Sequence, residues 1–366
     1  MKIAIITFSC MNTNYGSILQ AYALKKFLES LGHNVKFIKY REFHKIYPQN
    51  FSALLKFLLV RLYKFLHICR LKKRETNFVE FIERNLPHTR LYTSEQDLEK
   101  NLGTYDVYIC GSDQIWNIPV LGGIREPYFL RFAPDCSKRI SYAASLGEYN
   151  IQDNHREDFK KYLSSIDVIS VRENKSIEYL KEITDKRIHQ VLDPVFLLSP
   201  EQWELIPSNI SLPKHDYAIC YFVRRNKLAN YMVEKLKKKY NITIYNVSDN
   251  LINVPYTSNR YATCAPGDFV HLIKNARFCV GTSFHLAAFS VILGKQVFIA
   301  GSEHNKERVE SILKLVGMED HLFFSEEDAD RLLIGGDFNG LTKRDELIGK
   351  IRSSQEFLID NLEDGK

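Results

Sequence analysis

The sequence of 366 residues lacks the motifs that identify several common enzyme and redox classes. It contains no G-x-G-x-x-G, no G-x-x-x-x-G-K-[ST] and no H-E-x-x-H, which argues against the usual dinucleotide, P-loop and zinc-protease sites. Its seven cysteines are scattered without a C-x-x-C pair, so we interpret them as buried thiols. An Asp328-Ala329-Asp330 triplet resembles a metal-binding motif, but Ser325 three residues before Asp328 is typical of a capping box. We therefore expect no metal and no cofactor.

Low-complexity tracts and extreme charge are also missing. A hydrophobic content of 45% with 26% charged residues is typical of a globular chain without long disorder. The formal charge of +6 favours anionic ligands, but no recognition-helix pattern accompanies it, which argues against a nucleic-acid partner. Met1 and Lys2 run directly into an apolar strand and leave no room for a signal peptide. We therefore expect a cytoplasmic protein.

Apolar strand-like runs alternate with helical segments, a pattern typical of parallel α/β domains. In the first half the predicted strands are 3–8, 35–39, 107–110, 140–143, 168–171 and 188–192, with a helix over 17–31. The pattern restarts after Asp193-Pro194, with strands at 217–223, 242–245, 278–280 and 297–299 and a helix over 228–239. We predict two doubly wound, Rossmann-like domains facing a cleft, 1–196 and 197–345, and a C-terminal helix over 346–366 that packs back on the first domain.

The segment 51–73 is amphipathic. Its apolar face carries Leu54, Leu55, Leu58, Leu59, Leu62, Phe65 and Leu66, and its polar face carries Lys56, Lys64, His67 and Arg74. Charges interrupt the segment too often for a membrane span. Two interpretations stay open: a helix packed on the sheet with a solvated basic side, or peripheral contact with anionic lipid at the inner face of a membrane.

The segment 276–300 makes the most specific prediction of a binding site. A short strand ends in a tight polar turn made of Gly281, Thr282 and Ser283, and an apolar helix then begins at Phe284. Such a turn points the first N–H groups of the helix at the space beyond the strand, where anions bind. His285 lies in the first turn and could donate a proton there. Alternatively, Ser283 is only an N-cap and His285 a packed helix residue.

Polar residues follow two strands of the first half at their carboxyl ends. After the first strand come Asn14, Tyr15 and Gly16, where Gly16 allows close backbone approach to a ligand and Asn14 offers hydrogen bonds. After the strand 107–110 come Ser112, Asp113 and Gln114, and Asp113 could act as a base or orient a sugar hydroxyl. An ordinary turn would also favour Asn14 and Gly16, and Ser112 and Asp113 could equally cap a helix.

Arg172 follows the strand 168–171 and is suited to a bidentate grip on carboxylate or phosphate. Its alternative role is a surface ion pair with Glu173.

Taken in this order, these segments resemble the polysaccharide pyruvyl transferase family. The matching segments are 14–24, 111–117, 138–145, 169–173, 191–194, 283–285 and 289–290. The resemblance covers the chain except for 43–104 and its C-terminal end.

The resemblance implies a glycosyltransferase-B-like fold and transfer of pyruvate, as a ketal, from phosphoenolpyruvate to a sugar. The sugar belongs to a cell-surface polysaccharide, such as a capsule or exopolysaccharide, or to its lipid-linked precursor. In the family the histidine at the position of His285 serves as acid and arginines hold phosphoenolpyruvate. Some members carry an arginine two residues before that histidine, where this chain has Ser283. Another arginine must then supply the charge: Arg172, Arg224, Arg225 or Arg308.

The expected partners are phosphoenolpyruvate on the second domain and a sugar acceptor, in the form of a lipid-linked oligosaccharide, on the first. Association into a homo-oligomer is left open. Two other functions also stay open, namely a nucleotide-sugar-dependent glycosyltransferase of the same fold and a non-catalytic sugar-binding component of a polysaccharide assembly complex.

Overall fold

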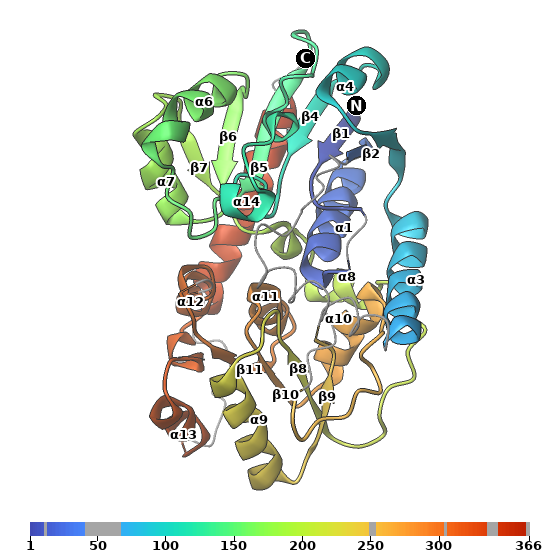
Figure 1. The fold of residues 1–366 in the computed structure, drawn as a ribbon, viewed down its shortest axis with the longest axis vertical. Coiled ribbons are helices and arrows are strands. Elements are labelled where there is room, and N and C mark those ends of the chain that lie inside the picture. The colour runs from blue at the N-terminus through green and yellow to red at the C-terminus, as the bar shows by residue number, and fades with distance from the viewer. Residues whose placement is uncertain (11–12, 41–66, 249–253, 304–305, 335–342, 364–366) are drawn as a thin grey trace, which may run out of the picture.

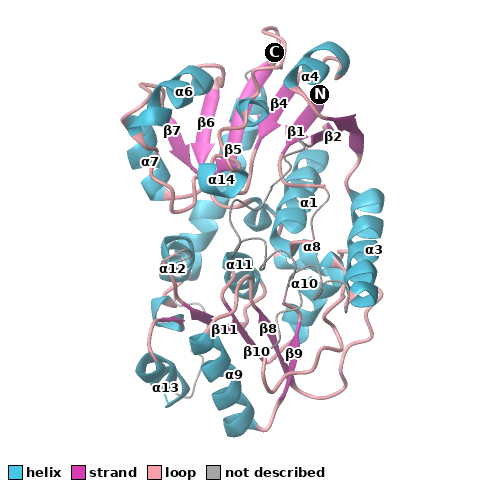
Figure 2. Cartoon of the chain, viewed as in Figure 1, coloured by secondary structure: helices cyan, strands magenta, loops and turns pink. Residues whose placement is uncertain are grey.

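The structure, a computed structural model, describes residues 1–10, 13–40, 67–248, 254–303, 306–334 and 343–363. Two parallel sheets form the upper and lower halves of the molecule (Figures 1 and 2). The first sheet has seven strands: β1 (Lys2–Ile6), β2 (Asn34–Tyr40), β3 (His88–Tyr92), β4 (Val107–Cys110), β5 (Lys138–Ala144), β6 (Val168–Val171) and β7 (Ile188–Gln190). The second has five: β8 (Tyr217–Tyr221), β9 (Thr243–Asn246), β10 (Phe278–Gly281), β11 (Gln296–Ala300) and β12 (Leu322–Phe323).

Helices connect the strands and cover the sheets (Figure 2). They are α1 (Tyr15–Ser30), α3 (Ile68–Asn85), α4 (Glu95–Asn101), α5 (Ile118–Leu121), α6 (Asp153–Leu163), α7 (Asn174–Lys181), α8 (Pro200–Glu204), α9 (Lys227–Tyr240), α10 (Pro266–Asn275), α11 (Phe284–Ile292), α12 (Lys306–Leu315), α13 (Glu326–Ile334) and α14 (Arg344–Glu363). The first helix shows how local sequence defines these bounds. Asn14 caps the start of α1 by accepting the N–H of Ser17, and the helix ends before Gly32, whose φ of 83° suits glycine.

In each sheet the strands are added first toward one edge and then toward the other, so the strand order reverses once. The first order is β3-β2-β1-β4-β5-β6-β7, so the chain turns back beside β1, where Ile5 pairs with both Phe37 and Ile109. The second order is β12-β11-β10-β8-β9, with the reversal between β8 and β10. Ligands of doubly wound sheets bind at the carboxyl ends of strands beside such a reversal. The predicted pair of Rossmann-like domains is thereby confirmed.

Two strands escaped the sequence analysis. The strand β3 lies at the sheet edge and is only partly buried, and its sequence His-Thr-Arg-Leu-Tyr begins with three polar residues and contains no long apolar run. The strand β12 has two residues, too few for any pattern.

An apolar core passes between the two sheets and joins them. Tyr15 of α1 is completely buried and stacks on Phe269 of α10, with ring centroids 4.3 Å apart. Its hydroxyl donates to the carbonyl of Cys264 at 3.0 Å. Tyr15 therefore connects the two halves, which corrects the expectation that it contacts substrate. Beside it, Trp203 packs between Tyr22 and Phe289.

The C-terminal helix α14 crosses to the first sheet (Figure 1). The N–H of Leu192, just after β7, donates to Ser354 Oγ at 2.9 Å, and the ring of Phe357 lies beside Tyr142 of β5. The predicted helix over 346–366 thus contacts the first sheet, and the boundaries at 196/197 and 345/346 remain predictions.

The apolar face of the amphipathic segment lies outside the described residues, since 41–66 are not described. Its last predicted basic residue, Arg74, is described and does not face solvent. It lies buried in α3, where Nη1 donates to Tyr15 Oη at 3.2 Å and to the Ala262 carbonyl at 2.8 Å. A third hydrogen bond runs from Nη2 to the Thr13 carbonyl at 3.1 Å. Arg74 is therefore a domain contact rather than part of a lipid-facing surface. None of the helices in the described ranges is long and apolar enough to cross a membrane.

We predict that Arg74→Ala lowers the free energy of unfolding by about 2–4 kcal/mol, because it leaves buried acceptors from both halves of the molecule without a donor. The matched control is Lys73→Ala, which removes an exposed charge from the same helix and should change stability by no more than about 0.5 kcal/mol. Urea unfolding of both variants measures the difference. Equal stabilities would contradict the assigned role of Arg74.

Candidate active site

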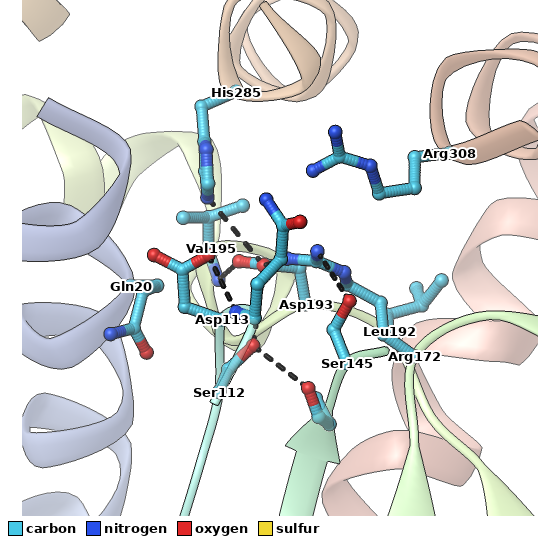
Figure 3. A network of polar contacts seen from close by, with 12 residues as sticks. Gln20, Ser112, Asp113, Ser145, Arg172, Leu192, Asp193, Val195, His285 and Arg308 are labelled. Atoms are coloured by element: carbon cyan, nitrogen blue, oxygen red, sulfur yellow. Dashed lines mark hydrogen bonds and ion pairs between the residues drawn. The ribbon is translucent and has the colours of Figure 1, made fainter. Parts of the chain in front are cut away.

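Loops at the carboxyl ends of the first sheet face the N-terminus of α11 (Figure 3). Side chains from the two sides form a polar cluster, by which we mean Ser112, Asp113, Ser145, Arg172, Glu173, Asp193 and His285. Most of these residues are distant in sequence, and all are buried. The cluster therefore joins the predicted acid His285 to two of the predicted loops of the first sheet.

Asp193 lies at the centre of the polar cluster and is completely buried. Its Oδ2 accepts a hydrogen bond from Arg172 Nη1 at 2.7 Å and from Ser112 Oγ at 3.4 Å, and lies 3.5 Å from His285 Nε2. Its Oδ1 accepts the N–H of Val195 at 3.1 Å. One carboxylate thus lies against the imidazole and binds the arginine and the serine.

The charges of the cluster stabilise one another. Burial alone would raise the pKa of Asp193, but His285 and Arg172, by charge and hydrogen bonding, hold it well below its usual range. Burial would also lower the pKa of Arg172, yet the carboxylates of Glu173, Asp193 and Asp113 raise it instead. Both Asp193 and Arg172 are therefore ionised despite their burial.

Arg172 is largely committed to this cluster. Its Nε donates to Glu173 Oε1 at 2.8 Å and its Nη2 to Ser145 Oγ at 3.2 Å, and the ring of Phe284 lies 4.7 Å from its guanidinium carbon. The ion pair with Glu173 exists, but it is buried rather than on the surface. With the bond to Asp193, these hydrogen bonds to described residues use three of the five N–H donors of the guanidinium. Two donors remain for a ligand.

Arg308 of α12 supplies a second cation. It is half-buried and its guanidinium points toward Arg172 (Figure 3). Burial, and next the charge of Arg172, lower its pKa. Because two guanidinium groups in one partly buried space repel each other, an anion between them would be stabilised by both.

Arg224, also predicted as a substrate contact, is exposed on the loop after β8, and so is Arg225. In the described part of the chain neither has a hydrogen bond or ion pair to the polar cluster. Among the four candidate arginines, the structure brings together Arg172 and Arg308 only.

The turn before α11 leaves the first N–H groups of the helix without a side-chain cap from Ser283. Ser283 occupies the N-cap position, but its side chain makes no capping hydrogen bond. Gly281 fits closely, because a Cβ there would overlap the Tyr221 carbonyl, and Thr282 Oγ1 accepts the N–H of Val223 at 3.1 Å. The turn is thus fixed to the loop after β8, beside the chain reversal of the second sheet.

His285, from the second half of the molecule, packs against α1 of the first half. Its side chain is 10% exposed, and a Cβ at Gly16 would overlap the imidazole ring. Gly16 was predicted to let the backbone approach a ligand. In this structure the group that lies close to its backbone is the imidazole of His285.

The loop after β4 has an unusual backbone. Asp113 has a φ of 74° and its neighbour in β5, Ala143, has a φ of 50°, a region that costs energy for residues other than glycine and is found often at functional sites. Asp113 Oδ2 accepts from Ser17 Oγ at 2.7 Å, and Oδ1 accepts the N–H of Gln114 at 2.9 Å. The half-buried side chain of Gln114 accepts from Asn117 at 2.7 Å. Asp113 is thus held beside the cations of the cluster.

A pocket of about 350 Å³ begins at this cluster. Arg172, Asp193, Phe284 and Arg308 line one end, and its remaining wall comes mainly from α12 and α14. Its volume lies in the range of small-molecule sites. No group of three or more His, Cys, Asp or Glu side chains placed for a metal ion occurs within the described ranges, and Ser325 and Asp328 form the predicted capping box.

The central residue, Asp193, was not predicted as a site residue. Asp193 served only to mark where the strand pattern restarts and as part of a segment that matches the family, although it follows β7 at the same edge of the sheet as the other predicted residues. This position at the carboxyl end of a strand could have identified Asp193 as a site residue. Glu173, Ser145 and Ser17 were not predicted as site residues, because their role depends on contacts between distant loops.

Comparison with solved structures defines the class of fold. A UDP-GlcNAc 2-epimerase from Neisseria meningitidis, bound to UDP-GlcNAc, is similar with a TM-score of 0.51 and 11% identity, over 100% of both chains. A structure described as trehalose-6-phosphate from E. coli, bound with UDP-2-fluoro glucose, is similar with a TM-score of 0.50 and 9% identity, over 99% of both chains. With the two doubly wound sheets, these likenesses identify a glycosyltransferase-B-like fold, as predicted.

The family follows from the sequence match. The model of the polysaccharide pyruvyl transferase family matches residues 14–304, and the chain belongs to that family. No curated protein matches the chain.

We predict that Asp193→Asn destabilises the fold by about 3–5 kcal/mol at neutral pH, because it breaks a buried ion pair. The folded-state pKa of Asp193 is depressed, so its contribution is fully present above the unfolded pKa of about 3.9 and is lost as pH falls below it. The stability difference between wild type and variant should therefore be largest above pH 5 and shrink toward pH 3. Urea unfolding across this range measures it, and a difference that stays constant would contradict the assignment.

Proposed function

We propose that the protein transfers pyruvate from phosphoenolpyruvate to two hydroxyls of one sugar, forming a ketal, in the synthesis of a cell-surface polysaccharide or its lipid-linked precursor. The observation that carries this proposal is the meeting of His285, in the first turn of α11, with two arginines and a buried carboxylate. Membership of the pyruvyl transferase family supports it.

The reaction needs an acid on one side of the donor and cations on the other. A proton adds to the methylene carbon of phosphoenolpyruvate and leaves a cationic centre at C2. Two sugar hydroxyl oxygens bond to C2 in turn, and the bond from C2 to the phosphate ester oxygen breaks. One hydroxyl proton replaces the proton given by the acid, and the other leaves with phosphate. General acid catalysis and electrostatic stabilisation of the departing anion therefore account for the chemistry.

Each part of the site has a role in this proposal. His285 donates the proton, with Asp193 as its orienting partner and counter-charge. Arg308, the two remaining donors of Arg172 and the first N–H groups of α11 hold the donor's carboxylate and phosphate. Asp113 accepts a proton from an attacking hydroxyl, and the sugar lies along the first-sheet loops near Gln114 and Asn14.

Product analysis tests the reaction class. The wild-type protein is incubated with a candidate lipid-linked oligosaccharide and phosphoenolpyruvate, and mass spectrometry looks for a pyruvate ketal and released phosphate. Parallel reactions contain UDP- or GDP-sugars, since the similar solved structures hold UDP-linked sugars. Glycosyl transfer without ketal formation would replace the proposal with the glycosyltransferase alternative.

We predict that His285→Asn keeps the fold and binds phosphoenolpyruvate, but lowers turnover about 100-fold or more, the usual scale for loss of a general acid. Asparagine preserves a polar side chain of similar size while removing the titrating ring. Single-turnover rates and calorimetric binding separate the two effects. Turnover near that of wild type would exclude His285 as the proton donor.

We predict that Arg308→Ala weakens phosphoenolpyruvate binding by about 1.5–3 kcal/mol, the cost of charge-assisted hydrogen bonds. Arg224→Ala is the matched control, because it removes an exposed arginine that, between described residues, has no hydrogen bond or ion pair to the polar cluster, and it should leave the affinity unchanged. Isothermal calorimetry of both variants decides. A loss of affinity in Arg224→Ala alone would assign the donor to the loop after β8 instead.

A further inference from the structure

The pocket between α12 and α14 extends beyond the groups that the proposed chemistry uses. Its outer wall contains Lys314 of α12, Lys343 just before α14, and Lys350 of α14. Both helices lie beyond residue 304, where the match to the family model ends. This part of the pocket is therefore a feature of this chain that family membership does not describe.

The charge of the pocket is unevenly distributed. Five basic side chains and three carboxylates line it: Arg172, Arg308, Lys314, Lys343 and Lys350 against Glu173, Asp193 and Glu346. At the inner end, Glu173 and Asp193 pair with Arg172 and neutralise it. The excess of positive charge consequently lies toward the outer end.

The lysines of the outer end are not neutralised by neighbours. All three are exposed, and no ion pair between described residues includes Lys314, Lys343 or Lys350. Glu346 is the one carboxylate among the outer lining residues. Two helices and the segment before α14 thus contribute three lysines to the lining of one pocket, an arrangement that favours a multiply charged anion.

We propose that the outer end of this pocket binds the phosphate or diphosphate group of the sugar acceptor. The acceptor is then a glycosyl phosphate or diphosphate, whose anion lies against the three lysines while its sugar reaches the donor beside Arg308 and Arg172. The identification of this ligand as the acceptor rests on the proposed function. The anion site itself does not.

Calorimetry with inorganic pyrophosphate tests the site on the full chain. We expect wild type to bind pyrophosphate, with affinity that falls as salt is raised. Lys314→Ala and Lys350→Ala should each weaken binding about tenfold, and each should leave phosphoenolpyruvate binding within about twofold of wild type. Arg352→Ala is the matched control, because Arg352 is exposed on α14 but does not line the pocket, and it should bind pyrophosphate as wild type does.

Competition then identifies the source of the anion. Displacement of pyrophosphate by uridine diphosphate at lower concentration supports a nucleotide-linked acceptor, and displacement by geranyl diphosphate at lower concentration supports a lipid-linked one. The proposal is overturned if wild type does not bind pyrophosphate, if both lysine variants bind it as tightly as wild type, or if neither competitor displaces it. Pyrophosphate binding is measured without turnover, so a failure of ketal formation would overturn the proposed function and leave this site standing.

Discussion

The buried carboxylate of Asp193 is the contact on which the site depends. It brings the imidazole of α11, the guanidinium after β6 and the hydroxyl after β4 to one point, although these groups come from both halves of the molecule. A buried charge of this kind is tolerated because its partners compensate the loss of hydration, above all the guanidinium of Arg172 at 2.7 Å. The position of the proposed acid is therefore coupled to the stability of the first sheet.

The apolar core between the sheets holds the two halves of the molecule in this arrangement. Tyr15 stacks on Phe269, Trp203 packs between Tyr22 and Phe289, and Arg74 donates to carbonyls on both sides. Since these contacts surround the base of α1, Gly16 in its first turn meets His285 directly. The two halves thus present their loops to each other at a defined distance, which proton transfer and anion binding both need.

Ser283, two residues before His285, carries no charge, and the structure brings cations to the site from other segments. The guanidinium of Arg308 points toward Arg172 from α12, a helix outside the matched range 14–304. Its long side chain can supply positive charge from a different backbone position, because electrostatic stabilisation depends on where the charge lies rather than on which segment carries it. The same region of the chain forms the lysine-lined end of the pocket.

The sequence by itself determined the two parallel domains, the strand-turn-helix before His285 and the family. Those features are local: buried parallel strands are continuous apolar runs, and a helix start or stop is marked by residues such as Asn14 and Gly32. The edge strand β3 has no such run and was missed for that reason. Only the tertiary structure decided that Tyr15 and Arg74 join the domains, that Arg308 rather than Arg224 meets Arg172, and that Asp193 lies at the centre. These outcomes depend on contacts between residues far apart in the chain, and an isolated charged or aromatic residue has the same local pattern whether it faces a ligand, a neighbouring domain or solvent.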